Sequence, residues 1–131
     1  MASIANMNMD VVIEAKNHAK RFDVETEITF YPEEEKQPFI ISYKHNSDET
    51  RLGIIMLFPQ RDLYFTSAQL SFIIMHIRQM EEAGGEVLLV FNEQCLERVR
   101  RILDTTGVTN HAQLAVYTEE NSIYQMQWSL D

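Results

Sequence analysis

A helix that runs directly into a buried strand, between Tyr64 and Val90, constrains the fold of this chain more than any other stretch. Thr66 is placed to cap the helix, and Gln69, three residues on, completes a capping-box pattern. Gly84-Gly85 predicts the end of the helix, because glycine adopts the left-handed conformation at little steric cost. The apolar run Val87–Val90 is typical of a strand covered on both faces. Together these signals favour an α/β fold.

Two segments have apolar residues at helical spacing, which predicts one buried face for each helix. The first helix is expected over residues 67–83. The second is expected over residues 93–105, with Asn92 as its cap and Gly107 at its end. The two apolar stripes are Leu70, Ile73, Ile74 and Ile77 in the first helix, and Leu96, Val99 and Leu103 in the second, with Ile102 beside them.

Strand patterns surround these helices. Residues 24–31 alternate apolar with polar side chains, and residues 39–44 follow across a proline-bracketed connector, so the two should form a hairpin. Further strands are expected at 52–57, 87–90 and 114–117, with Gly53 allowing a close approach. Strand–helix–strand order predicts parallel pairing of these last three. The expected fold is a mixed sheet of about five strands, with helices mainly on one side.

The two ends of the chain carry weaker secondary-structure signals than its centre. Residues 10–22 predict an N-terminal helix that Asp10 can cap, and Met1–Met9 is expected to fray. Residues 121–131 fit either period two, as a strand, or helical spacing, and we favour the helix. At 131 residues the chain is long enough for one domain with a real core and too short for two ordinary ones, so residues 1–131 are expected to form a single domain.

Composition restricts the partners and the compartment. A net charge of −9 argues against nucleic acid and anionic membrane surfaces, because phosphate binding needs concentrated Lys and Arg. A single cysteine, Cys95, excludes an internal disulfide and fits a reducing compartment. No apolar run approaches the roughly 20 residues of a membrane span, and the N-terminus lacks a signal-peptide pattern. We therefore expect a cytoplasmic protein.

From residue 52 to 118 the order of signals resembles the STAS domain, the fold of anti-sigma-factor antagonists. The family pattern runs from an apolar strand through an Asp-Ser-Ser-Gly turn, a helix, Gly-Gly and a strand. A helix ending in Leu-x-x-Thr-Gly-Leu follows, and then a last strand that reads like Ile-Tyr-x-Thr. The matching pieces here are Ile54–Leu57, Thr66–Gln69, Leu70–Ala83, Gly84-Gly85, Val87–Val90, Val99–Val108 and Ala115–Thr118.

The resemblance places Ser67 at the phosphorylatable serine of the family. Thr66 stands where the family has aspartate, Ala68 where it has a second serine, and Gln69 where it has glycine. The N-terminal half departs from the family, because the predicted helix at 10–22 precedes the strands.

The resemblance also implies a function. It is that of a non-enzymatic module, without a cofactor, that binds a switch kinase or anti-sigma factor in a partner-switching pathway. Phosphorylation at Ser67, with Thr66 as alternative acceptor, would release the partner. A STAS-like scaffold or self-associating module without phosphorylation is the alternative, followed by a small enzyme whose site is not visible locally. We expect a monomer or weak homodimer.

The candidate site residues each have a structural alternative. Thr66 and Gln69 can simply cap the helix, with Ser67 tolerated in its first turn. Phe72 and Met75 lie off the main stripe, so they either pack under a neighbouring element or form a docking surface, where aromatic and Met side chains are favoured.

Other reactive residue types favour structural roles. The four histidines, His18, His45, His76 and His111, lack metal-ligand spacing, and no metal site is expected. Cys95 lies in the first turn of its helix, where a thiol pKa can be lowered, but a structural thiol is favoured. Glu33-Glu34-Glu35 is interpreted as a solvated connector. No catalytic motif is apparent.

Overall fold

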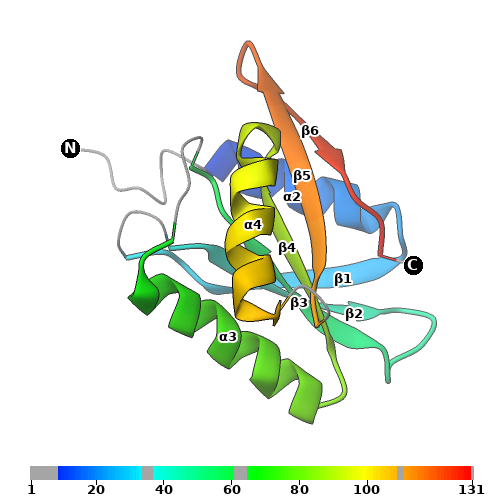
Figure 1. Cartoon of the computed structure of the whole chain (residues 1–131). Helices are drawn as coiled ribbons and strands as arrows, with labels where there is room; N and C mark the ends of the chain where they lie inside the picture. The colour runs from blue at the N-terminus through cyan, green and yellow to red at the C-terminus, as the bar shows by residue number, and fades with distance from the viewer. Residues whose placement is uncertain (1–8, 34–36, 61–64, 109–110, 131) are drawn as a thin grey trace.

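The computed structural model describes residues 9–33, 37–60, 65–108 and 111–130. Within these ranges six strands form one mixed sheet in chain order, β1-β2-β3-β4-β5-β6, with helices on both faces (Figure 1). This confirms the α/β class, with six strands in place of about five. The elements are α2 (Met9–Lys20), β1 (Val24–Phe30), β2 (Phe39–His45), β3 (Leu52–Leu57), α3 (Ser67–Glu82), β4 (Glu86–Asn92), the 3₁₀ turn η1 (Glu93–Cys95), α4 (Leu96–Thr106), β5 (Gln113–Glu120) and β6 (Ile123–Gln127).

The sheet changes from antiparallel to parallel pairing and back. β1, β2 and β3 pair antiparallel, so the predicted hairpin is confirmed. β3, β4 and β5 pair parallel, also as predicted, and α3 and α4 make the two crossovers. β6 returns antiparallel to β5. The sheet therefore ends in two edge strands, β1 and β6.

Alternating side chains of the strands build a separate core on each face. On the face covered by α3 and α4, the predicted stripes are buried at Ile73, Ile77, Val99 and Leu103. Their other members, Leu70, Ile74, Leu96 and Ile102, are only partly buried. On the opposite face α2 packs through four buried residues against alternate strand positions, and Trp128 and Leu130 close that core. The four residues of α2 are Val11, Val12, Ala15 and Ala19.

Glycines end both crossover helices as predicted. Gly84 has φ +73° after α3, and Gly107 has φ +76° after α4. The N–H of Gly85 donates to the carbonyl of Met80 at 2.7 Å, which satisfies a carbonyl of the last turn. The second crossover helix starts differently from its prediction, because Glu93–Cys95 forms a 3₁₀ turn before the α-helix.

The prediction of a helix at residues 121–131 is wrong. Residues Ile123–Gln127 form β6, in register with β5. Asn121 and Ser122 both have positive φ, at 54° and 67°, and make a two-residue hairpin turn. That turn aligns Tyr124 and Met126 with the α2 core, so period two is the spacing that is realised.

The N-terminal helix is confirmed with an adjustment. Asp10 lies inside the first described turn of α2 rather than ahead of the helix. The expected fraying of Met1–Met9 falls almost wholly on residues outside the described ranges, as do Tyr64 and Glu34-Glu35 of the predicted connector. None of the described helices combines the length and the apolar character of a membrane-spanning segment.

Candidate functional site

The start of α3 is held by the predicted capping box. Thr66 is extended, with φ −77° and ψ 168°, and its Oγ1 accepts a hydrogen bond from the N–H of Gln69 at 3.3 Å. The Gln69 side chain reciprocates, because its Oε1 accepts from the N–H of Thr66 at 2.9 Å. Two N–H groups that the helix itself leaves open are thus satisfied. Thr66 and Gln69 therefore fix the position of Ser67, which lies between them in the sequence as the first residue of α3.

Ser67 is the first residue of α3 and is exposed. Beside it lies a hollow of about 250 Å³ between the first two turns of α3, the entry to β2 and the end of β3. Its walls are the side chains or backbone of Gln37, Pro38, Phe58, Thr66, Ala68, Gln69, Phe72 and Ile73. Ser67 is not itself a wall residue, but its exposed side chain stands between two that are, Thr66 and Ala68.

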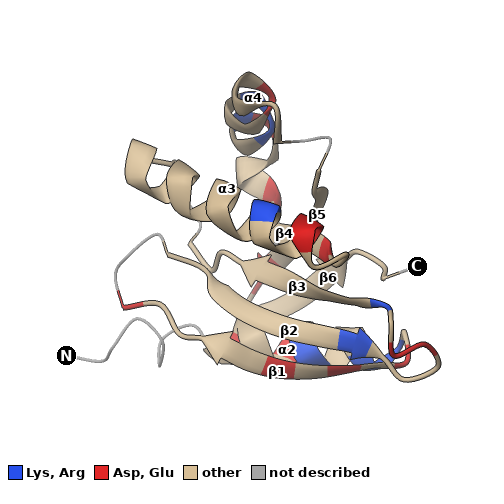
Figure 2. Ribbon diagram, turned by 90° about the horizontal axis from the view of Figure 1, so that it is seen from below, with Lys and Arg blue, Asp and Glu red and all other residues tan. Residues whose placement is uncertain are grey.

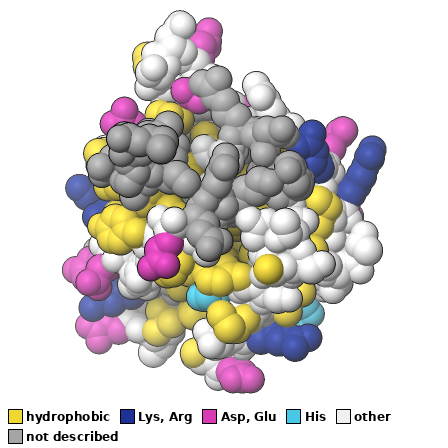
Figure 3. All heavy atoms as spheres, turned by 90° about the vertical axis from the view of Figure 1, so that its left-hand side faces the viewer, with side chains coloured by type: hydrophobic (Ala, Val, Ile, Leu, Met, Phe, Trp, Pro, Cys, Tyr) yellow, Lys and Arg dark blue, Asp and Glu magenta, His cyan; other side chains and the backbone are white. Residues whose placement is uncertain are grey.

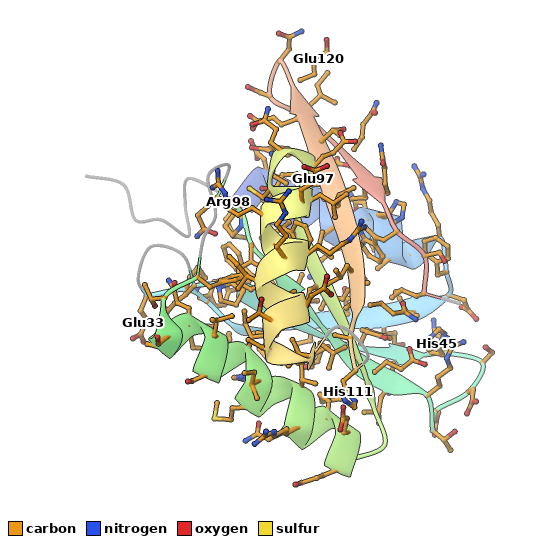
Figure 4. The ribbon with its side chains drawn as sticks, in the orientation of Figure 1. Glu33, His45, Glu97, Arg98, His111 and Glu120 are labelled. Carbon is orange, nitrogen blue, oxygen red and sulfur yellow. The ribbon has the colours of Figure 1, made fainter. Side chains whose placement is uncertain are left out.

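The outward side of α3 carries an unusual lack of charge. From Leu63 to Ile77 the sequence contains no Asp, Glu, Lys or Arg, and Figure 2 draws α3 without charged residues over most of its length. The exposed residues there are Ser67, Ala68, Ser71 and Met75. The outward side of α4 is different, since Glu97 and Arg98 (Figure 4) are followed by Arg100, Arg101 and Asp104, all exposed.

Phe72 and Met75 have different environments on α3. Phe72 is half-buried and packs between Phe30 and His76, with ring centroids at 5.6 Å and 4.4 Å. Met75 is 45% exposed. Figure 3 shows hydrophobic side chains at the surface on the side of the molecule where α3 begins, the left-hand side of Figure 1. We call the exposed Ser67, Ala68, Ser71 and Met75, together with Phe72, the α3 surface. Packing against Phe30 of β1 thus explains why Phe72 is half-buried. Met75 lies on the outward side of α3, where a docking partner could contact it.

The contributions of Phe30 and His76 were not foreseen from the sequence. Phe30 reaches α3 because the β1–β2 register shifts between Ile28 and Phe30, which moves the Phe30 side chain onto the α3 face. His76 Nδ1 lies 2.9 Å from the carbonyl of Phe72, one turn earlier. The spacing of four residues between Phe72 and His76 was visible in the sequence, whereas the register shift that places Phe30 was not.

The remaining predicted reactive residues lie apart from Ser67 and from one another. Cys95, the last residue of η1, is 1% exposed. At the start of η1 the Oδ1 of Asn92 accepts a hydrogen bond from the N–H of Gln94 at 3.0 Å. His45 and His111 belong to different regions (Figure 4), and His111 Nδ1 lies 2.6 Å from Glu81 Oε1. His45 is buried on β2. Among the described residues, no group of three or more His, Cys, Asp or Glu side chains could hold a metal ion.

A half-buried polar network at the start of β4 was not foreseen from the sequence. Glu86 accepts hydrogen bonds from the hydroxyl of Tyr43 at 2.8 Å and from Nε of Arg51 at 2.9 Å. Burial raises the pKa of Glu86, but the hydrogen bonds from Arg51 and Tyr43 and the charge of Arg51 outweigh it, so this pKa lies below its ordinary value. Burial and the bond to Glu86 raise the pKa of Tyr43. The network joins β2, β4 and the residue just before β3, at the end of the sheet opposite the start of α3.

Replacing Glu86 by glutamine is expected to reduce the loss of stability in acid. Because the pKa of Glu86 is lower in the folded than in the unfolded chain, its contribution is fully present above the unfolded pKa and is lost as pH falls through the folded pKa. Urea unfolding across the acidic range measures this. Glu97→Gln, on the exposed side of α4, is the control. An unchanged pH dependence in Glu86→Gln would show that the network leaves the carboxylate unperturbed.

The start of α3 can accept an anion. Exposed N–H groups of a first helical turn and the positive end of the helix dipole favour a negative group there, and Ser67 offers a hydroxyl to carry one. The flanking α3 surface, free of formal charge, suits contact with another protein better than with a polar metabolite. Compared with protein-family models, with curated proteins and with solved structures, the chain shows no match.

Proposed function

We propose that this protein is a non-enzymatic, cytoplasmic interaction module that binds a regulatory protein through the α3 surface and is controlled by phosphorylation at Ser67. The observation that carries the proposal is an accessible hydroxyl at the first residue of α3, directly beside an outward helix side without charged residues. Depletion of charge, with Met and aromatic side chains at the centre, is the composition of a protein–protein interface core.

A phosphate on Ser67 would be compatible with the fold and incompatible with the contact. It would add up to about two negative charges at a helix N-terminus, where N–H groups and the dipole favour them. The same charges would enter an interface that has none of its own, and an uncompensated charge buried there is costly. Modification would therefore weaken binding without unfolding the protein. Thr66 is a less suitable acceptor, because its Oγ1 already serves the capping box.

The sequence resemblance to STAS domains over residues 52–118 supports the same proposal. It aligns Ser67 with the regulatory serine of anti-sigma-factor antagonists and suggests a switch kinase or anti-sigma factor as partner. The partner's contact surface is expected to be basic around an apolar centre, because a net charge of −9 steers basic surfaces toward this chain. An equivalent scaffold without phosphorylation would use the α3 surface but leave Ser67 unmodified.

Substituting Ser67 by aspartate is expected to weaken partner binding by about tenfold or more, equivalent to about 1.4 kcal/mol. The partner is first captured on the immobilised wild-type chain, identified, purified and measured by titration calorimetry. Ser67→Asp should keep the wild-type melting temperature, because an acid is favourable in the first helical turn. Ser67→Ala should bind normally and resist phosphorylation by the partner kinase, as read by mass spectrometry.

Two variants separate this effect from general ones. Gln94→Glu places an acid in the first turn of η1, away from the α3 surface, and should leave binding unchanged. Thr66→Ala removes the cap and should lower stability by about 1 kcal/mol with binding intact. Equal binding by Ser67→Asp and wild type, with phosphate on neither hydroxyl, would contradict the switch. If Met75→Glu then loses binding while Ser67→Asp does not, the result supports the scaffold hypothesis, in which the α3 surface binds the partner without phosphorylation.

A further inference from the structure

The two edges of the sheet differ in how they are protected against pairing with another strand. β1 carries the exposed acids Glu25 and Glu27, has a register shift after Ile28 and is followed by Pro32. Charges, irregularities and proline are the usual obstacles to strand addition. β6 has none of them. Its register with β5 is regular, and residues 121–130 include no Asp, Glu, Lys, Arg or Pro.

The hairpin turn determines which residues of β6 face outward. In a two-residue hairpin the pair next to the turn, Glu120 and Ile123, exchanges both backbone hydrogen bonds, and every second pair repeats this. Ile123, Gln125 and Gln127 thus direct their backbone groups to β5. The alternate positions direct theirs to the outer side, where no described strand lies.

This pattern allows few registers for a second copy of β6. In an antiparallel pair, two residues that lie opposite each other either both direct their backbone groups to the partner strand or both direct them away. When the two strands are copies of β6, this holds only if the two-fold axis passes through a residue and not between two residues. Only the axis at Gln125 pairs all five residues of β6, with Ile123 opposite Gln127 of the other copy. Gln125 then faces its own equivalent in a non-hydrogen-bonded pair, the closest side-chain approach in a sheet. Ile123, 65% exposed, would gain cover.

The charges beside this edge are self-complementary. A hollow of about 330 Å³ between α2 and β6 has Glu14 and Arg21 in its walls and reaches Gln125 and Gln127 at the open edge. His18 Nε2 lies 2.6 Å from the Trp128 carbonyl, and α2 and β6 advance toward the same end (Figure 1). An antiparallel copy therefore brings its Glu14 toward Arg21, and its Arg21 toward Glu14. Glu120 lies at the hairpin tip (Figure 4), beyond the paired residues.

We propose that two copies of this chain associate through their β6 edges, in antiparallel register about Gln125, to form one continuous sheet of twelve strands. A two-fold axis perpendicular to the sheet keeps both α2 helices on one face and both α3 surfaces on the other. The proposal is independent of Ser67 and of the regulatory partner.

Opposite charges at position 125 provide the test, because this residue meets itself across the axis. Gln125→Glu and Gln125→Lys should each weaken self-association at least about fivefold, since like charges directly opposite are unfavourable. An equimolar mixture of the two variants should associate at least as well as the wild type, as a heterodimer. Sedimentation velocity over a wide concentration range reads both, and circular dichroism confirms that each variant is folded.

The same pair of substitutions at Gln94, exposed on η1, is the matched control and should leave self-association unchanged. In the wild-type dimer, amide exchange of β6 should slow as concentration rises, whereas that of β1 should not. A wild-type chain that stays monomeric at all concentrations would overturn the proposal. So would a dimer whose dissociation constant is indifferent to charge at position 125.

Discussion

Replacing Leu103 by alanine is expected to lower the free energy of unfolding by about 2–5 kcal/mol. Leu103 is fully buried where α4 packs on the sheet, in the same core as Ile73 of α3. Truncation removes buried methyl groups and leaves a cavity that a close-packed interior fills only in part. Ile73→Ala should produce a loss of the same size. Chemical denaturation with urea measures both.

Neighbouring residues of the same helices serve as controls. Ile102, beside Leu103, is only partly buried, and Met75 is 45% exposed, so alanine at either position should cost distinctly less. A Leu103→Ala variant as stable as the wild type would mean that α4 does not pack on the sheet through this stripe.

Replacing Gly53 by alanine is expected to cost about 3 kcal/mol, the upper part of the usual range for overpacking. A Cβ at this position would lie 2.6 Å from the backbone oxygen of Glu86 and 2.6 Å from both Cζ and the hydroxyl of Tyr43. The Glu86 oxygen belongs to β4, in register with Gly53. Relief therefore requires both that the parallel β3–β4 pair separates and that the Tyr43 ring moves away from Gly53. Thermal unfolding should show a large decrease in melting temperature.

Gly85→Ala is the matched control for this crowding. Its Cβ would meet the terminal methyl of Met80, which can rotate away, and the Leu52 backbone oxygen at 3.2 Å. The loss should be clearly smaller than at Gly53. Equal losses at the two glycines would show that the general cost of adding a methyl group, rather than the fixed backbone of β4, determines the result.

The central half of the fold was predictable because its signals are local. Helix spacing in α3 and α4, the glycines at 84 and 107 and the apolar run at 87–90 each specify structure within a few residues. β6 was not predicted correctly, because residues 121–131 carry both periods. The decision between them comes from the turn at Asn121-Ser122 and from packing against α2, more than a hundred residues away in the chain.

The candidate site divides in the same way. Thr66, Ser67 and Gln69 act within one helical turn, so their arrangement followed from their spacing. The neighbours of Phe72 did not, since Phe30 reaches it through an irregularity of β1. The Tyr43–Arg51–Glu86 network joins residues from three segments, and only Gly53 hinted at a close approach there.

The contact between His18 and Trp128 has a consequence for the synthesis of the chain. Because the strands lie side by side in the order in which they leave the ribosome, each can pair with the one before it, and the core under α3 and α4 is complete once β5 has emerged. The apolar side of α2, which is made before any of the six strands, waits for Trp128 and Leu130, which are made after all of them. While the strands emerge, the nascent chain therefore presents an uncovered α2 to chaperones and proteases, until Trp128 and Leu130 cover it.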